Sequence, residues 1–187
     1  FGVGIVGGET SSSPAAAVAV TLTGTVSPSR ILRRSGGKPG DKIFVTGKLG
    51  GSLRGKHLDF VPRLAEGQWL GASGLASAMM DLSDGLAADL PRLAEASGCG
   101  FVIDPALVPR NRGCTTESAI ADGEDYELVF TVPSRKEASL QRRWRIRFPR
   151  VPLTAIGHLT RAGGVASALP AGFDHFFHCQ PGPERAS

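Results

Sequence analysis

Hydrophobic and polar positions along the chain predict a series of short strands and helices. Runs of apolar and β-branched residues, typical of strands, occupy residues 15–26, 42–46, 101–103 and 128–132. Apolar residues at helical spacing occupy residues 61–70 and 86–94, and a helix-ending Ser-Gly pair follows at 97–98. Because strands and helices alternate, this pattern favours an α/β architecture.

Two segments carry less regular patterns. Trp144, Ile146 and Phe148 alternate with arginines, which predicts a strand with one solvated, basic face. Pro91 falls inside the second helical pattern and predicts either a kink or a later start of that helix. Apolar stretches at 76–82 and 151–156 add two more segments able to enter a core.

The composition restricts the class of protein. The 187 residues include 25 glycines and 13 prolines, but no Gly-X-Y period runs through them, which excludes collagen. With 41% hydrophobic and 20% charged residues, the chain has enough apolar surface to form a core. Because the sequence begins at Phe1 and its first residues look like the middle of a domain, we expect a truncated or processed chain.

Charge and cysteine usage argue against several function classes. The net charge of +4 is mild, whereas a nucleic-acid binder concentrates more charge on one face. Residues 135–150 hold seven basic side chains, which favour a solvated face over nucleic-acid binding. Three widely spaced cysteines form no CxxC pair, so free thiols in a reducing cytoplasm are expected. The longest apolar run, at 15–20, is far shorter than the roughly 20 residues of a membrane helix.

Glycine-rich segments near the start suggest close approach of a ligand. Residues 2–7 match GxGxxG, but no strand precedes the match and no acid follows at the required spacing, which disfavours a dinucleotide site. Residues 5–10 (IVGGET) combine an apolar run, two glycines, a carboxylate at Glu9 and a hydroxyl. A carboxylate at a strand end can hold a hard cation, and a simple turn is the alternative.

The most specific local pattern is DLSDGL at residues 81–86. Asp81, Ser83 and Asp84 place two carboxylates and a hydroxyl between an apolar run and a helical pattern. Capping of the helix by Ser83 or Asp84 is one interpretation, but capping requires only one of the acids. Carboxylates at a helix start also suit a Mg²⁺–phosphate site, so both interpretations stay open.

A second acidic segment, DGEDYEL at residues 122–128, packs four acids in front of a strand. Such runs usually form solvated turns. Tyr126 is the single tyrosine of the chain, and an aromatic ring inside an acidic loop suggests contact with a cationic or aromatic ligand. No GxxxxGK[ST] loop occurs, so any nucleotide site must have a different design.

Seven segments, taken in order along the chain, resemble thiamine-monophosphate kinase, a family within the ATP-binding superfamily of aminoimidazole ribonucleotide synthetase. They are GGET at 7–10, SGGKPGD at 35–41, VTGKLGG at 45–51, DLSDGL at 81–86, GEDYEL at 123–128, the Ile-Gly pair at 156–157 and GFDHF at 172–176. The combination of DLSDGL with GEDYEL is specific. The resemblance implies transfer of the γ-phosphoryl group of ATP to thiamine phosphate, giving thiamine diphosphate with the help of Mg²⁺.

The resemblance also implies roles for individual residues. The positions that contact ATP in the family correspond here to Gly8, Glu9, Arg34 and Ser83. Those that hold Mg²⁺ correspond to Glu9, Asp81 and Asp84, and those that contact thiamine phosphate correspond to Glu124 and Phe173. Glu9 stands where the family has aspartate, and Asp122 replaces the first glycine of the family's GGEDYEL. No covalent catalytic residue is assigned, because phosphoryl transfer depends on positioning and charge neutralisation.

We therefore expect an α/β carboxy-terminal domain of the aminoimidazole ribonucleotide synthetase type at residues 29–187, with a sheet packed against helices. Residues 1–28 are expected to be the end of a truncated amino-terminal domain. The full-length protein is expected to be a cytoplasmic homodimer that acts on thiamine phosphate and ATP and binds neither nucleic acid nor a membrane. Two alternatives stay open, a sister enzyme of the superfamily with another substrate and a non-catalytic binding or dimerisation module.

Overall fold

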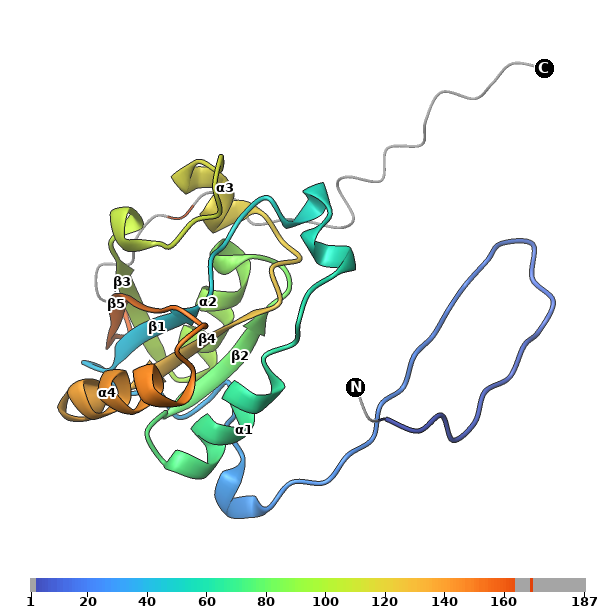
Figure 1. The fold of residues 1–187 in the computed structure, drawn as a ribbon. Helices are drawn as coiled ribbons and strands as arrows, with labels where there is room; N and C mark the ends of the chain where they lie inside the picture. The colour runs from blue at the N-terminus through green and yellow to red at the C-terminus, as the bar shows by residue number, and fades with distance from the viewer. Residues whose placement is uncertain (1–2, 164–168, 170–187) are drawn as a thin grey trace.

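A five-stranded sheet forms the centre of the molecule in the computed structural model, which describes residues 3–163 and 169 (Figure 1). The strands are β1 (Lys42–Thr46), β2 (Ala78–Leu82), β3 (Cys99–Ile103), β4 (Glu127–Val132) and β5 (Leu153–Arg161). They lie in the order β2-β4-β1-β5-β3, and every neighbouring pair is antiparallel. Sequence-distant strands therefore lie side by side, which brings the ends of β2 and β4 together.

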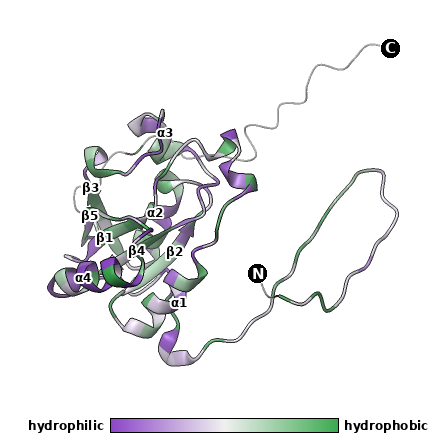
Figure 2. Ribbon diagram, viewed as in Figure 1, coloured by the Kyte–Doolittle hydropathy of each residue, from purple (hydrophilic) through white to green (hydrophobic). Residues whose placement is uncertain are grey.

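Helices cover both faces of the sheet. They are α1 (Leu64–Ser73), α2 (Leu86–Ala96), α3 (Thr116–Ala121) and α4 (Glu137–Arg147). Side chains alternate along the strands, so Phe44 packs toward α1 and α4 whereas Ile43 and Val45 pack toward α2 and α3. The apolar side chains thus form two core clusters separated by the sheet, and Figure 2 shows hydrophilic residues on the outward side of α4.

Most of the elements expected from periodicity are confirmed. The strands at 42–46, 101–103 and 128–132 correspond to β1, β3 and β4, and the helical patterns correspond to α1 and α2. Pro91 lies inside α2, which begins at Leu86, so the expected later start is wrong. Of the cysteines, Cys99 and Cys114 are free thiols as expected, while Cys179 lies outside the described residues.

The strand expected at 144–148 is wrong, because these residues form the end of α4 and its cap. Leu140, Trp144 and Phe148 follow one another at four-residue intervals and are buried together against the sheet. Ile146, which the alternation places beside them, is 79% exposed. The helical spacing of the larger aromatic residues therefore outweighs the two-residue alternation.

The strand expected at 15–26 is also wrong. Residues 3–31 are exposed and contain no regular element except a short 3₁₀ turn at Pro28–Arg30. Figure 1 shows this segment running outside the sheet and helices, and no neighbouring strand in the described part of the chain pairs with it. A strand needs such a neighbour to satisfy its backbone groups. The domain boundary near residue 28 stays a prediction.

No helix in the described part of the chain is both long and apolar enough for a membrane crossing.

Candidate active site

Two acidic loops lie against each other where β2 ends and β4 begins. The first leads from β2 into α2, and the second leads from α3 into β4. The backbone N–H of Glu124 donates to the carbonyl oxygen of Ser83 at 2.7 Å, and that of Tyr126 donates to Leu82 at 2.8 Å. These bonds fix the DLSDGL and GEDYEL segments in contact with each other.

Gly85 is the point of closest approach between the two loops. Its φ of +90° lies in the region that favours glycine, and a Cβ at this position would lie 2.5 Å from the carbonyl oxygen of Asp122. Any side chain here would push the loops apart. Close packing of the two loops therefore requires a glycine at this position of DLSDGL.

The acids of the first loop do not cap α2. The helix begins after Gly85 and has no side-chain cap, so the capping interpretation is wrong. Instead, Arg92 donates to the carboxylates of both Asp84 and Asp89, at 2.9 Å for Asp89. The Asp84 backbone N–H also donates to Asp89 at 2.9 Å. Asp84 is therefore held by residues of α2, the helix that follows it, while Asp81 is exposed near the end of β2.

Residues of the second loop adopt an uncommon backbone conformation. Glu124 has φ 64° and Tyr126 has φ 52°, and these are the only positive φ values among the described non-glycine residues. Each such residue costs about 1–2 kcal/mol. Strain of this kind persists where surrounding structure enforces it, commonly at functional sites.

Tyr126 links the two loops electrostatically. Its hydroxyl donates to the Glu124 carboxylate, and its ring stacks on Phe60 with centroids 4.2 Å apart. The hydrogen bond to Glu124, burial, and the negative charges of Glu124, Asp81 and Asp84 raise the pKa of Tyr126 to about 12. Three carboxylates and a phenol therefore share one electrostatic environment.

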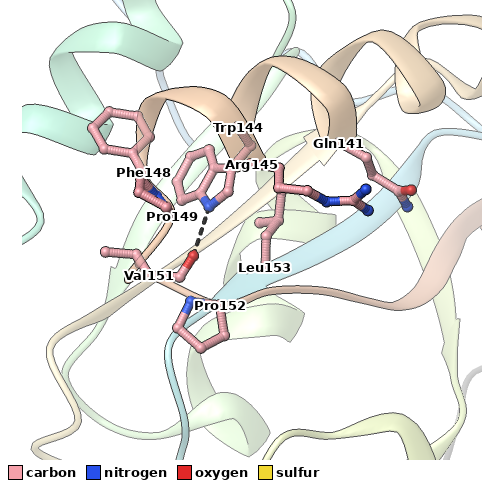
Figure 3. A pocket seen from close by; sticks show the side chains of 8 residues that line it. All are labelled: Gln141, Trp144, Arg145, Phe148, Pro149, Val151, Pro152 and Leu153. Carbon is pink, nitrogen blue, oxygen red and sulfur yellow. Dashed lines mark hydrogen bonds between the residues drawn. The ribbon is translucent and has the colours of Figure 1, made fainter.

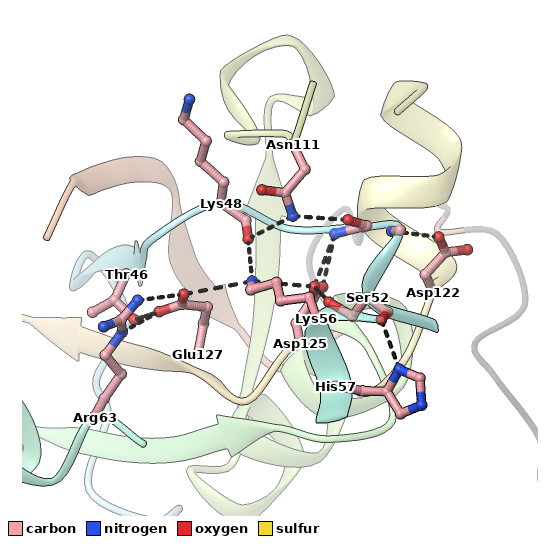
Figure 4. A network of polar contacts seen from close by, with 12 residues as sticks. Thr46, Lys48, Ser52, Lys56, His57, Arg63, Asn111, Asp122, Asp125 and Glu127 are labelled. Atoms are coloured by element: carbon pink, nitrogen blue, oxygen red, sulfur yellow. Dashed lines mark hydrogen bonds and ion pairs between the residues drawn. The ribbon is translucent and has the colours of Figure 1, made fainter. Parts of the chain in front are cut away.

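Asp125 and Glu127, which alternate with Glu124 and Tyr126 along the second loop, have a structural role. Asp125 is 2% exposed and accepts hydrogen bonds from the Gly50 backbone N–H, at 2.9 and 3.0 Å, and from the Ser52 hydroxyl (Figure 4). Burial raises the pKa of Asp125. This side chain anchors the glycine turn that follows β1.

Glu127 anchors a second element of the same network. Its carboxylate accepts from Arg63 Nε at 2.7 Å and Nη2 at 2.8 Å, and from the Thr46 hydroxyl at 2.7 Å (Figure 4). The hydrogen bond to Glu127 raises the pKa of Arg63. Lys56 Nζ lies 3.7 Å from the same carboxylate. The solvated turn expected at this acidic segment is thus wrong for Asp125 and Glu127.

The structure brings together only part of the predicted site. Asp81, Ser83, Asp84 and Glu124 lie on the two contacting loops. Gly8 and Glu9 lie in the exposed N-terminal segment, with no atom within 4 Å of a Cβ built at Gly8.

The remaining predicted residues contribute less. Arg34 is exposed, and its carbonyl oxygen accepts from the Ser97 hydroxyl at 3.0 Å, while its side chain makes no hydrogen bond or ion pair with the described residues. Phe173 lies outside the described residues. Its role, like those of Gly8, Glu9 and Arg34, stays a prediction.

Sequence reasoning missed Phe60, Arg63 and Arg92. Arg92 lies two turns after Asp84, and its three-residue spacing from Asp89 was a usable signal. Arg63 is 64 residues from Glu127, so no local pattern links them. Phe60 is likewise brought to Tyr126 only by the fold.

The two loops suit a magnesium ion that is shared with phosphate rather than enclosed by protein. Within residues 3–163 and 169, no group of three or more His, Cys, Asp or Glu side chains is arranged to hold a metal. Mg²⁺ commonly uses one or two carboxylates, water and substrate phosphates. Asp81 and Asp84 fit that donor set.

A separate hollow lies between α4 and the start of β5. It has a volume of about 290 Å³ and is lined by Trp144, Arg145 and Phe148 together with the segment that leads into β5 (Figure 3). The Trp144 Nε1 donates to the Val151 carbonyl oxygen at 2.8 Å. Its lining contains no carboxylate, so it lacks the chemistry of the acidic loops.

Four of the five strands and both acidic loops lie within the region that defines a known class of protein. Residues 52–169 match the model of the AIR synthase related protein, C-terminal domain. The chain therefore belongs to this family, and the expected α/β domain of this type is confirmed.

Within that family, the chain is similar to thiamine-monophosphate kinases. It is 34% identical to the one from Salmonella typhimurium, over 92% of this chain and 63% of that protein. The crystal structure of the Stenotrophomonas maltophilia K279a thiamine-monophosphate kinase is 28% identical, with a TM-score of 0.64 over 80% of this chain and 54% of that one.

A third relative was solved with ligands. AaThiL complexed with AMPPCP and TMP is 30% identical, with a TM-score of 0.55 over 78% of this chain and 54% of that one. The chain thus spans less than two thirds of the length of these relatives.

Proposed function

We propose that the protein transfers the γ-phosphoryl group of ATP to thiamine phosphate, giving thiamine diphosphate. The similarity to thiamine-monophosphate kinases supports this activity, and so does the AaThiL complex with AMPPCP and TMP. The observation that carries the proposal is the contact between DLSDGL and GEDYEL, because it gathers Asp81, Asp84 and Glu124 around one place.

In this proposal, each residue of the two loops has a separate role in binding metal, nucleotide or substrate. Asp81 and Asp84 hold Mg²⁺, which when bound neutralises charge on the phosphates. Arg92 orients the Asp84 carboxylate before the nucleotide arrives. Ser83 contacts the nucleotide, and Glu124, fixed by the Tyr126 hydroxyl, contacts the substrate. Positioning of this kind is what phosphoryl transfer requires.

Other parts of the proposal rest on the resemblance alone. Gly8, Glu9 and Arg34 contact the nucleotide, Glu9 also contacts the metal, and Phe173 contacts thiamine phosphate. The protein acts as a homodimer in the cytoplasm, without nucleic acid or membrane. These statements stay predictions.

The direct test is turnover of thiamine phosphate by the intact protein with ATP and Mg²⁺. Asp84→Asn keeps the shape of the side chain but removes its charge, and we expect kcat/KM to fall about 100-fold or more. Glu95→Gln is the matched control, because Glu95 is exposed on α2, the helix that follows Asp84. Absence of turnover in the unmodified protein, or equal activity of the two variants, contradicts the proposal.

A further inference from the structure

A pocket lined by basic side chains lies beside the glycine turn that Asp125 anchors. Its volume is about 280 Å³, and its lining includes Gly50, Gly51, Arg54, Lys56, Asn111 and Arg112. The turn, the 3₁₀ segments that follow it, and the loop between β3 and α3 all contribute. Three segments of the chain thus converge on one small, positively charged hollow.

The charge of this pocket is not cancelled within its own lining, which contains no carboxylate. Two acidic side chains beside the pocket are bound to the glycine turn. Asp125 accepts from the Gly50 N–H, and Asp122 accepts from the Gly51 N–H at 2.9 Å (Figure 4). Asp125 and Glu127 also lie 3.9 and 3.7 Å from Lys56, so the two arginines are the side chains of the lining whose charge is not compensated by an ion pair in the described part of the chain.

Two of the three cations are not used by the fold. Arg54 and Arg112 are exposed, and their side chains make no hydrogen bond or ion pair with the part of the chain that the structure describes, although the Arg54 backbone N–H donates to the Gly51 carbonyl oxygen at 3.1 Å. Lys56, by contrast, donates to the Lys48 carbonyl oxygen at 3.1 Å and lies 3.9 Å from Asp125. The guanidinium groups of both arginines are therefore available to a ligand.

Asn111 fixes one side of the pocket through hydrogen bonds to the glycine turn. Its amide Nδ2 donates to the Gly50 carbonyl oxygen at 2.8 Å, and its backbone N–H donates to Leu49 at 3.0 Å. The loop that carries Arg112 is thus tied to the turn that leads to Arg54. The backbone positions of the two arginines are therefore connected, so both side chains are attached at the same hollow.

We propose that this pocket binds the phosphate group of a small molecule. Guanidinium groups present planar pairs of N–H donors that match phosphate oxygens, and two arginines without an ion-pair partner in the described part of the chain favour an anion. The site is distinct from the acidic loops, because none of Asp81, Ser83, Asp84 and Glu124 belongs to its lining. It needs neither Mg²⁺ nor kinase activity.

The test is calorimetry with inorganic phosphate, without Mg²⁺ or nucleotide, at an ionic strength held constant with chloride. We expect saturable binding that Arg54→Gln and Arg112→Gln each weaken about 10- to 100-fold. Arg142→Gln, at an exposed position of α4, is the control and should bind like the unmodified protein.

Further titrations with thiamine phosphate and AMP identify the source of the phosphate group. A compound that binds more tightly than inorganic phosphate, and loses that affinity in Arg112→Gln, defines the organic part of the ligand. No saturable phosphate binding, or equal affinity in all three variants, overturns the proposal. Thermal unfolding of each variant checks that the fold is intact, as expected because neither arginine side chain makes a hydrogen bond or ion pair within residues 3–163 and 169.

Discussion

The segment 124–127 presents two sides that differ in almost every physical respect. Asp125 and Glu127 are buried and fully hydrogen-bonded to the glycine turn, Arg63 and Thr46. Glu124 and Tyr126 lie toward the other acidic loop with a strained backbone. The comparison teaches that a run of acids need not share one role. Buried carboxylates hold the fold, and those at the rim are available for chemistry.

The largest expected effect on stability comes from removing a buried carboxylate of segment 124–127. Asp125→Ala leaves the Gly50 N–H and the Ser52 hydroxyl without an acceptor, which should lower the free energy of unfolding by about 2–5 kcal/mol. Asp81→Ala, at an exposed position, should change it by less than about 0.5 kcal/mol. Urea unfolding of the two variants measures the difference.

Asp125→Asn sharpens this comparison. Because burial already raises the pKa of Asp125, its negative charge adds little stability, and the orphaned donors account for most of the loss in Asp125→Ala. The asparagine keeps one acceptor oxygen, so its cost should be smaller than that of alanine. Equal costs for the two variants would show that charge, not hydrogen bonding, is what the fold requires.

A smaller effect on stability is expected from changes at Glu124, whose backbone is strained. Glu124→Gly and Glu124→Ala remove the same carboxylate, but only glycine relieves the positive φ. We expect the glycine variant to be more stable than the alanine variant by about 1 kcal/mol, while both lose activity toward thiamine phosphate. Denaturant unfolding and turnover are measured on the same preparations. If the two variants are equally stable, position 124 is not strained.

The smallest effect on stability concerns the ionisation of Tyr126. Its pKa is raised from the ordinary value of 10.0 to about 12, chiefly by the hydrogen bond to Glu124. Because the folded pKa is the higher one, Tyr126 contributes stability that is present below pH 10 and is lost as the pH rises through about 12. Ultraviolet titration measures this pKa directly, since the chain has no other tyrosine.

Glu124→Gln tests the cause of that shift. It should return the pKa of Tyr126 toward 10, whereas Glu117→Gln, at an exposed position of α3, should leave it raised. Circular dichroism at each pH separates titration of the folded protein from unfolding. Ionisation near pH 10 while the protein is still folded would mean that the hydroxyl does not contact Glu124.

Periodicity predicted most of the central elements because their burial is one-sided. It failed at α4, where Arg-Trp-Arg-Ile-Arg-Phe suggests alternation although Trp144 and Phe148 also satisfy helical spacing. Trp144 and Phe148 fit both the two-residue alternation of a strand and the four-residue spacing of a helix. Only packing against the sheet distinguishes them, and that packing involves strands far away in the sequence.

The acidic motifs were recognisable from sequence, but the sequence did not show which acids are buried structural groups and which lie at the candidate site. Asp125, Glu127 and Val129 are buried at alternate positions, so an alternation of burial like that of a strand begins in the loop before β4 and in principle marks the two acids as buried. Their partners, Gly50 and Arg63, are more than 60 residues away. Long-range pairing of this kind is set by the strand order, which no local pattern predicts.

The aromatic layer beneath α4 has an optical consequence. The two tryptophans of the chain, Trp69 and Trp144, both lie there, with ring centroids 5.9 Å apart. Intrinsic fluorescence therefore reports on one face of the sheet, while the absorbance of the lone tyrosine reports on the acidic loops. The protein carries two spectroscopic reporters on two separate regions, so coincidence of their unfolding curves would reveal whether both regions melt as one unit.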